Sequence, residues 1–149
     1  AALELGTSNA RGSTINVPAP PFSGDEGYMH ALERILGPAA RRFDPELIIL
    51  SAGFDGHWRD PLAHIQLSIT GYARQVQFVI DLAAELCDGK LVCALEGGYD
   101  LEVLPHCILS TLRLLSGNEA GISDPFGPAP DGERNMDGLI EQIREIHGL

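Results

Sequence analysis

The sequence lacks the features of several large classes of protein. Its apolar runs, such as Leu47 to Leu50 and Leu91 to Leu95, are far shorter than the roughly 20 residues that cross a bilayer, so we expect no membrane span. Only ten of the 149 residues are Lys or Arg, against 21 Asp and Glu, and the net charge of −11 argues against a nucleic-acid partner. The first residues contain neither a basic stretch nor an apolar core, so we expect no secretion signal.

Cysteine is also scarce. Cys87, Cys93 and Cys107 form no CxxC pair, and an odd number of cysteines in apolar surroundings predicts buried free thiols rather than a disulfide framework. Free thiols persist in a reducing compartment, which favours a cytoplasmic protein. The chain is nevertheless 44% hydrophobic, which is enough for one domain with a buried core.

The apolar pattern predicts alternating strands and helices. Leu47 to Ser51 and Lys90 to Leu95 are continuous apolar runs, typical of parallel strands that are covered on both faces. Between and around them, apolar residues recur at helical spacing over about 25–43, 70–87, 101–115 and 136–147. Gly37-Pro38 should kink or split the first of these helices. The order predicts βαβ units and a parallel sheet.

Two polar loops follow the predicted strands. Ligands of such sheets bind beyond the carboxyl ends of the strands, so both loops are candidate sites. The first loop reads Ser51-Ala-Gly-Phe-Asp-Gly-His-Trp-Arg-Asp-Pro-Leu62, and the second reads Glu96-Gly-Gly-Tyr-Asp100.

Residue types alone leave two readings open for each loop. Asp55 could cap a turn, or its carboxylate could bind a metal at the mouth of the sheet. Tyr99 could pack its ring in the core with the hydroxyl at the rim, or it could donate a hydrogen bond to a developing oxyanion.

Four segments, taken in order, resemble the zinc-dependent deacetylases, the family of histone deacetylases and acetylpolyamine amidohydrolases. The segments are Asn16-Val-Pro18, Ser51-Ala-Gly-Phe-Asp55, Asp60-Pro-Leu62 and Glu96-Gly-Gly-Tyr99, and bacterial histone deacetylase-like amidohydrolases are the nearest likeness. The resemblance implies an α/β, three-layer arginase/deacetylase-like fold with a mostly parallel sheet. Residues 1–149 would be the C-terminal portion of this fold. Within it we expect a core of about 12–117, a linker of about 117–134 and a terminal helix of about 135–148.

The resemblance also implies roles for particular residues. Asp55 would be one of three ligands of a catalytic Zn²⁺. Tyr99 would donate a hydrogen bond to the substrate amide oxygen and stabilise the tetrahedral intermediate. Gly97, Gly98 and Leu62 would line a narrow channel for the acyl-lysine side chain. The implied substrates are acetyl-lysine proteins or peptides, or acetylpolyamines, and the sequence does not distinguish them.

Two further residues of the first loop need separate interpretation. Asp55-Gly56-His57 spells the Asp-x-His pattern that supplies the family's other zinc ligands, but that pattern belongs to an earlier strand, so we interpret His57 as a loop residue. Asp60 is expected to be structural.

The family's paired histidines and its Asp-x-His ligands would lie upstream of the matched segments. The resemblance therefore implies an incomplete zinc site, and we expect this chain alone to be inactive. The missing N-terminal half, in cis or in trans, should cover an exposed apolar flank of the sheet, and a homodimer through that edge is another way to cover it. The alternative is a non-catalytic scaffold or interaction domain that retains the deacetylase fold.

Overall fold

The computed structural model describes residues 5–7, 9, 12–118 and 120–149, and its helices and strands follow the order that the apolar pattern predicts. In chain order they are α1 (Asp25–Ala31), the π-helix η2 (Leu32–Leu36), α2 (Gly37–Phe43), β1 (Ile48–Gly53), α3 (Ile69–Cys87), β2 (Leu91–Gly97), α4 (Val103–Leu115) and α5 (Asp137–His147). Over these described ranges, every helix is too short or too polar to cross a membrane.

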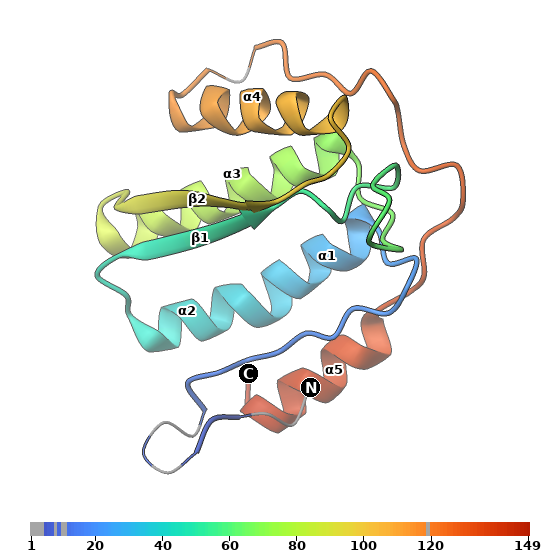
Figure 1. Ribbon diagram of the computed structural model, residues 1–149. Coiled ribbons are helices and arrows are strands. Elements are labelled where there is room, and N and C mark those ends of the chain that lie inside the picture. The colour runs from blue at the N-terminus through green and yellow to red at the C-terminus, as the bar shows by residue number, and fades with distance from the viewer. Residues whose placement is uncertain (1–4, 8, 10–11, 119) are drawn as a thin grey trace.

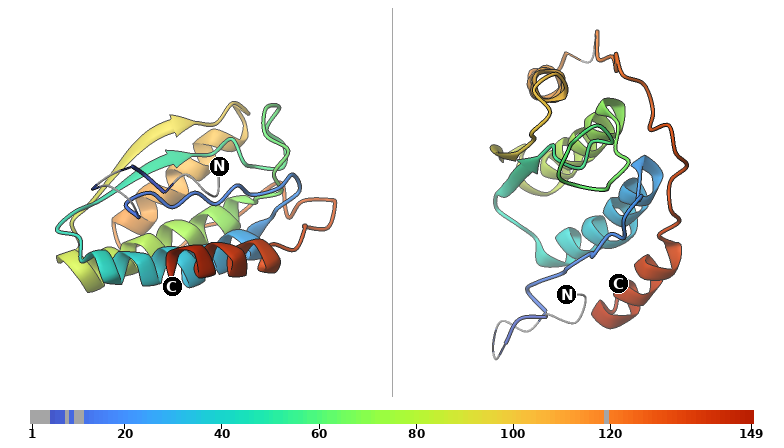
Figure 2. Two further views of the ribbon diagram at one scale, coloured as in Figure 1. Left: turned by 90° about the horizontal axis from the view of Figure 1, so that it is seen from below. Right: turned by 45° about the vertical axis from the view of Figure 1, so that its right-hand side comes forward.

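The two strands form a parallel pair. Ile48 is opposite Leu91 and Gly53 is opposite Gly97, with one irregularity in the register after Ala52. Because α3 connects the strands, β1, α3 and β2 form the expected βαβ unit. The strands lie in front of α3 in Figure 1, and the left view of Figure 2 shows α3, α1 and α2 gathered on one side of them.

The described residues cover only one face of this sheet, which corrects the expectation of strands covered on both faces. Ala52 belongs to an apolar core that includes residues of α3 and α4, and Leu50 packs against that core. On the opposite face, the side chains of Ile49 and Val92 are 65% and 51% exposed. The continuous apolar run correctly indicated a strand, but the second covering layer would have to come from outside the described residues.

The expected break at Gly37-Pro38 takes the form of a change in helix type. Gly37 donates its N–H to the carbonyl of Leu32, five residues earlier, which closes a π-turn instead of an α-turn. Pro38 then lies in the first turn of α2, a position that tolerates proline. As a result α1, η2 and α2 continue as one rod (Figure 1).

The terminal helix α5 packs against this rod. Ile140 and Ile143 are fully buried and form a second apolar core with Ile35 of η2 and with Met136. The amphipathic pattern of the last predicted helix therefore corresponds to a real buried face.

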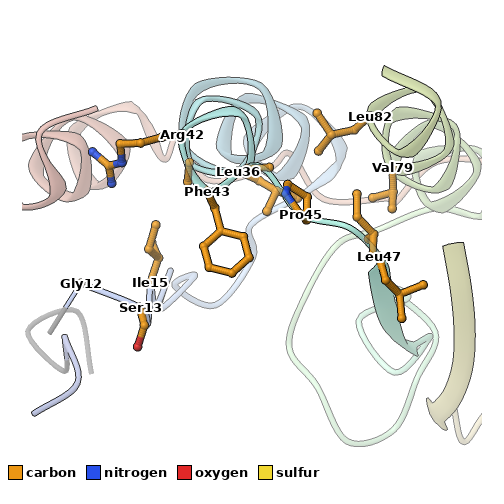
Figure 3. Close-up of a pocket in the computed structure, with 13 residues that line it drawn as sticks. Gly12, Ser13, Ile15, Leu36, Arg42, Phe43, Pro45, Leu47, Val79 and Leu82 are labelled. Atoms are coloured by element: carbon orange, nitrogen blue, oxygen red, sulfur yellow. The ribbon is translucent and has the colours of Figure 1, made fainter. Parts of the chain in front are cut away.

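An apolar pocket of about 540 Å³ lies between α2, α3 and the start of β1. Figure 3 shows the ring of Phe43 in this pocket, between Ile15 and Leu47. The pocket is at the amino end of β1, whereas the two polar loops follow the carboxyl ends of the strands. It is therefore separate from the predicted site.

Candidate active site

The register of the sheet brings the two polar loops to the same edge. Gly53 and Gly97 are paired at the ends of β1 and β2, and Phe54 donates its N–H to the carbonyl of Gly97 over 3.0 Å. Asp55 and Tyr99 each follow two residues after those paired glycines. A carboxylate and a phenol that are far apart in the sequence thus leave the sheet at one end.

The Asp55 carboxylate is half-buried between two glycines. A Cβ atom built on Gly53 would lie 2.8 Å from Asp55 Oδ1, and one built on Gly97 would lie 3.1 Å from it. Among the described residues none donates a hydrogen bond to this carboxylate, so the structure gives no support to the turn-capping reading of Asp55. Its two oxygens remain available to an outside ligand.

The charge of Asp55 affects the pKa values of two tyrosines. Burial raises the pKa of Tyr28, and the negative charge of Asp55 raises it further. Burial is also the main reason that the pKa of Tyr72 is raised, and Asp55 adds a smaller contribution in the same direction. Both phenols therefore stay protonated at pH 7.

Tyr99 is presented to solvent and held by its backbone. Its side chain is 53% exposed, which excludes the reading of a ring packed in the core of the described chain. Its N–H is donated to Asp60 Oδ2 over 2.7 Å, and Asp60 Oδ1 accepts the N–H of Leu62 over 2.9 Å. Asp60 is buried, so its carboxylate ties the two loops together, in agreement with the structural role expected for it.

Backbone conformation and close contacts explain why the two residues before Tyr99 are glycines. Gly98 has φ of +129°, a conformation that other residues rarely adopt, and a Cβ on it would come within 2.8 Å of Leu104 Cδ1. A Cβ on Gly97 would crowd Asp55. Leu62 is 65% exposed beside this edge. A substrate channel along Gly97, Gly98 and Leu62 stays a prediction.

His57 lies in the loop, as interpreted, but it is fully buried, which the sequence did not indicate. Its ring stacks on Trp58 with centroids 5.6 Å apart, and its Nδ1 accepts the N–H of Arg59 over 3.2 Å. Burial lowers the pKa of His57, so the ring is neutral in the folded protein at pH 7. These contacts give His57 a packing role on the inner side of the loop.

Sequence reasoning overlooked Arg59. Its guanidinium contacts Asp100 Oδ2 at 3.4 Å and Glu102 Oε2 at 2.6 Å, and so joins the first loop to the residues that follow Tyr99. No local pattern indicates these contacts, because the partners are more than 40 positions away from Arg59 in the chain.

The described residues hold no group of three or more His, Cys, Asp and Glu side chains that could bind a metal ion. A catalytic Zn²⁺ normally has three protein ligands and one open position. Asp55 has the donor chemistry and the free oxygens for one of these ligands, and the other two would have to come from outside the described residues.

Comparison with known proteins gives a consistent result. Residues 1–115 match the family described as histone deacetylase domain. A probable deacetylase of Archaeoglobus fulgidus is 38% identical over 130 residues, which cover 86% of this chain and 36% of the relative. A histone deacetylase-like amidohydrolase of Pseudomonas aeruginosa is 39% identical over 125 residues, covering 84% and 33%.

Two solved structures are also similar. The crystal structure of the HDA15 HD domain has a TM-score of 0.80 at 30% identity and covers 99% of this chain and 39% of that chain. The structure of the histone deacetylase Clr3 also has a TM-score of 0.80 at 30% identity, with 98% and 23% covered. The chain thus spans about a third of the length of the curated relatives it matches.

Proposed function

Because the chain belongs to the histone deacetylase family, we propose that it is the C-terminal part of a zinc-dependent deacetylase that hydrolyses acyl amides of lysine or of polyamines. Its fold is a partial α/β arginase/deacetylase fold with a parallel pair of strands. The two loops at the carboxyl edge of the sheet would then be parts of a deacetylase site.

One observation carries the proposal. The sheet register brings Asp55 and Tyr99 to the same edge, with the Asp55 carboxylate free of hydrogen-bond donors from the described residues and the Tyr99 side chain half exposed. A metal ligand needs a free carboxylate, and an oxyanion donor needs an accessible hydroxyl. The arrangement meets both requirements at one place.

The proposed chemistry divides between the metal and this chain. Zn²⁺ when bound would polarise the acyl carbonyl and lower the pKa of water at the site. Asp55 would supply one ligand, and the Tyr99 hydroxyl would donate a hydrogen bond to the carbonyl oxygen as negative charge develops on it. Gly97, Gly98 and Leu62 would form part of the wall along which the acyl-lysine or acylated polyamine enters.

We also propose that the rest of the fold packs on the open face of the sheet. Ile49 and Val92 expose apolar surface there, and no further strand pairs with the outer edges of β1 and β2 among the described residues. The relatives are about three times as long as the part matched here. The additional region, supplied in cis or in trans, would cover this surface and provide the remaining zinc ligands and the general base.

The three free cysteines favour a reducing compartment. Cys87 and Cys107 are buried, Cys93 is half-buried, and all three are free thiols. Burial raises the pKa of Cys93 and that of Cys107, which keeps both protonated and poorly reactive. We therefore propose a cytoplasmic location.

The test uses the complete protein, meaning this chain joined to the upstream region that the resemblance implies. We expect it to bind Zn²⁺ and to hydrolyse an acetyl-lysine peptide or an acetylated polyamine. Tyr99→Phe should lower kcat by about 100- to 1000-fold and leave the zinc content unchanged, whereas Asp55→Ala should lower the zinc content.

The isolated chain is the matched control, and we expect no hydrolysis from it. Hydrolysis by the isolated chain would overturn the proposed incompleteness. If the complete protein holds Zn²⁺ but hydrolyses neither substrate, the deacetylase proposal fails and the scaffold or interaction domain becomes the better reading.

A further inference from the structure

Residues 124–127, which we call the strap, lie within the segment that was expected to be a linker. Asp124 turns the strap on itself, because its Oδ1 accepts the N–H of Phe126 over 2.9 Å and that of Gly127 over 3.0 Å. The other oxygen, Oδ2, accepts the N–H of Ile69 over 2.8 Å and so fastens the strap to the first residue of α3. The strap is therefore anchored at a fixed place on the fold.

The anchored strap supports the loop that carries Asp55. Trp58 donates its indole N–H to the carbonyl of Gly127 over 3.1 Å. The ring of Phe126 lies 4.2 Å from the Arg59 guanidinium carbon, a cation–π contact, and meets the buried ring of His57 edge-on with centroids 6.2 Å apart. Three consecutive loop residues, 57 to 59, thus contact the strap.

Arg59, which contacts the strap, also contacts the second loop. Its guanidinium bridges Asp100 and Glu102, and the side chain is only 29% exposed. Asp100 is the residue after Tyr99, and its Oδ1 accepts the N–H groups of Glu102 and Val103 at the start of α4. Burial opposes the charge of Asp100, but the hydrogen bonds from Val103 and Glu102, with a smaller contribution from Arg59, lower its pKa, so its carboxylate is charged at pH 7.

We propose that the strap is a positioning element of the candidate active site. Phe126 holds the Arg59 guanidinium over the face of its ring, and Arg59 in turn fixes the backbone beside Tyr99 relative to the loop of Asp55. None of the strap residues takes part in the chemistry. The inference rests on the proposed function for its meaning, but the contacts can be tested without any activity.

Amide hydrogen exchange of residues 1–149, followed by NMR, tests the positioning directly. The amide of Tyr99, which is bonded to Asp60, should exchange about tenfold faster in Phe126→Ala, because the variant loses one cation–π contact and its ring packing. Phe126→Tyr keeps the ring face and should exchange like the original chain. Phe43→Ala is the matched control, since Phe43 is 77% exposed at the opposite end of the sheet.

A second reporter separates positioning from general stability. The amide of Val76, in the buried face of α3, should keep its exchange rate in Phe126→Ala. An unchanged rate at Tyr99, or equal acceleration at Tyr99 and Val76, would overturn the inference. If Phe126→Ala does not fold, Arg59→Lys serves instead, because it keeps the charge but loses the planar group that stacks on the ring, and the same local acceleration is expected.

The complete protein then shows whether the positioning matters for catalysis. Phe126→Ala should lower kcat by about 10- to 100-fold with unchanged zinc content, as expected for a misplaced catalytic group. Loss of zinc, or an unaltered kcat, would count against the strap as a positioning element. If the complete protein has no deacetylase activity at all, the proposed function fails, and the exchange rates still decide whether the strap holds Tyr99.

Discussion

The carboxyl edge of the sheet and its open face differ in how many of their side chains find a partner within the chain. At the carboxyl edge, the Asp60 carboxylate and the Arg59 guanidinium each find partners from another loop. On the open face, Ile49 and Val92 remain exposed. The chain therefore holds its two polar loops together by itself, whereas covering the open face of the sheet requires residues outside those described.

The largest effect should follow from removing Asp60. Asp60→Ala leaves the N–H groups of Leu62 and Tyr99 without their acceptor in a partly buried place, so we expect the free energy of unfolding to fall by about 2–4 kcal/mol. Urea unfolding measures this. Asp131→Ala is the control, because Asp131 is exposed, and it should change stability by less than about 0.5 kcal/mol. An equal decrease in the free energy of unfolding in the two variants would mean that Asp60 does not stabilise the carboxyl edge.

Neighbouring residues of β1 offer the sharpest comparison of the two faces. Leu50→Thr should lower the free energy of unfolding by about 2–3 kcal/mol because Leu50 packs on the core. Ile49→Thr should cost less than about 0.5 kcal/mol in the isolated chain, since its side chain already faces solvent. Similar losses at both positions would show that the open face is covered in solution, for example by a second copy of the chain.

A smaller effect should appear as a pH dependence. Burial lowers the pKa of His57 below its ordinary value of 6.5, so the unfolded chain binds a proton in a range where the folded chain does not. The contribution of His57 to the free energy of unfolding should therefore be fully present above about pH 6.5 and should decrease as the pH falls below it. His57→Asn, which can still accept the N–H of Arg59, should have a flatter profile between pH 7.5 and pH 5.5 in urea unfolding. An unchanged slope would contradict the buried, neutral state of His57.

The smallest effect concerns Trp58, the single tryptophan of the chain. Because its indole N–H bonds the strap at Gly127, release of the strap should expose the ring. Phe126→Ala should raise acrylamide quenching of Trp58 fluorescence by up to about twofold, in proportion to the added exposure of a ring that is already partly open. Phe43→Ala should leave the quenching unchanged, and a rise in both variants would point to general loosening.

Much of the candidate site was predictable, and the unpredicted part has a common cause. The Asp55 and Tyr99 loops were found because a buried strand followed by polar residues is a local pattern. The burial of His57 and the contacts of Arg59 were missed, because they depend on Phe126 and Glu102, which are far away in the chain. The linker prediction also gave no indication that residues 124–127 support the Asp55 loop.

The sequence by itself determined the order of strands and helices, the likeness to the deacetylase family and the two loops at the strand ends, because periodicity and short motifs act over neighbouring residues. Only the tertiary structure decided which face of the sheet stays open, which carboxylate remains free of donors and which one ties the loops together. Those outcomes depend on atoms that meet across 39 or more positions, as Asp60 and Tyr99 do, and no local pattern records such meetings.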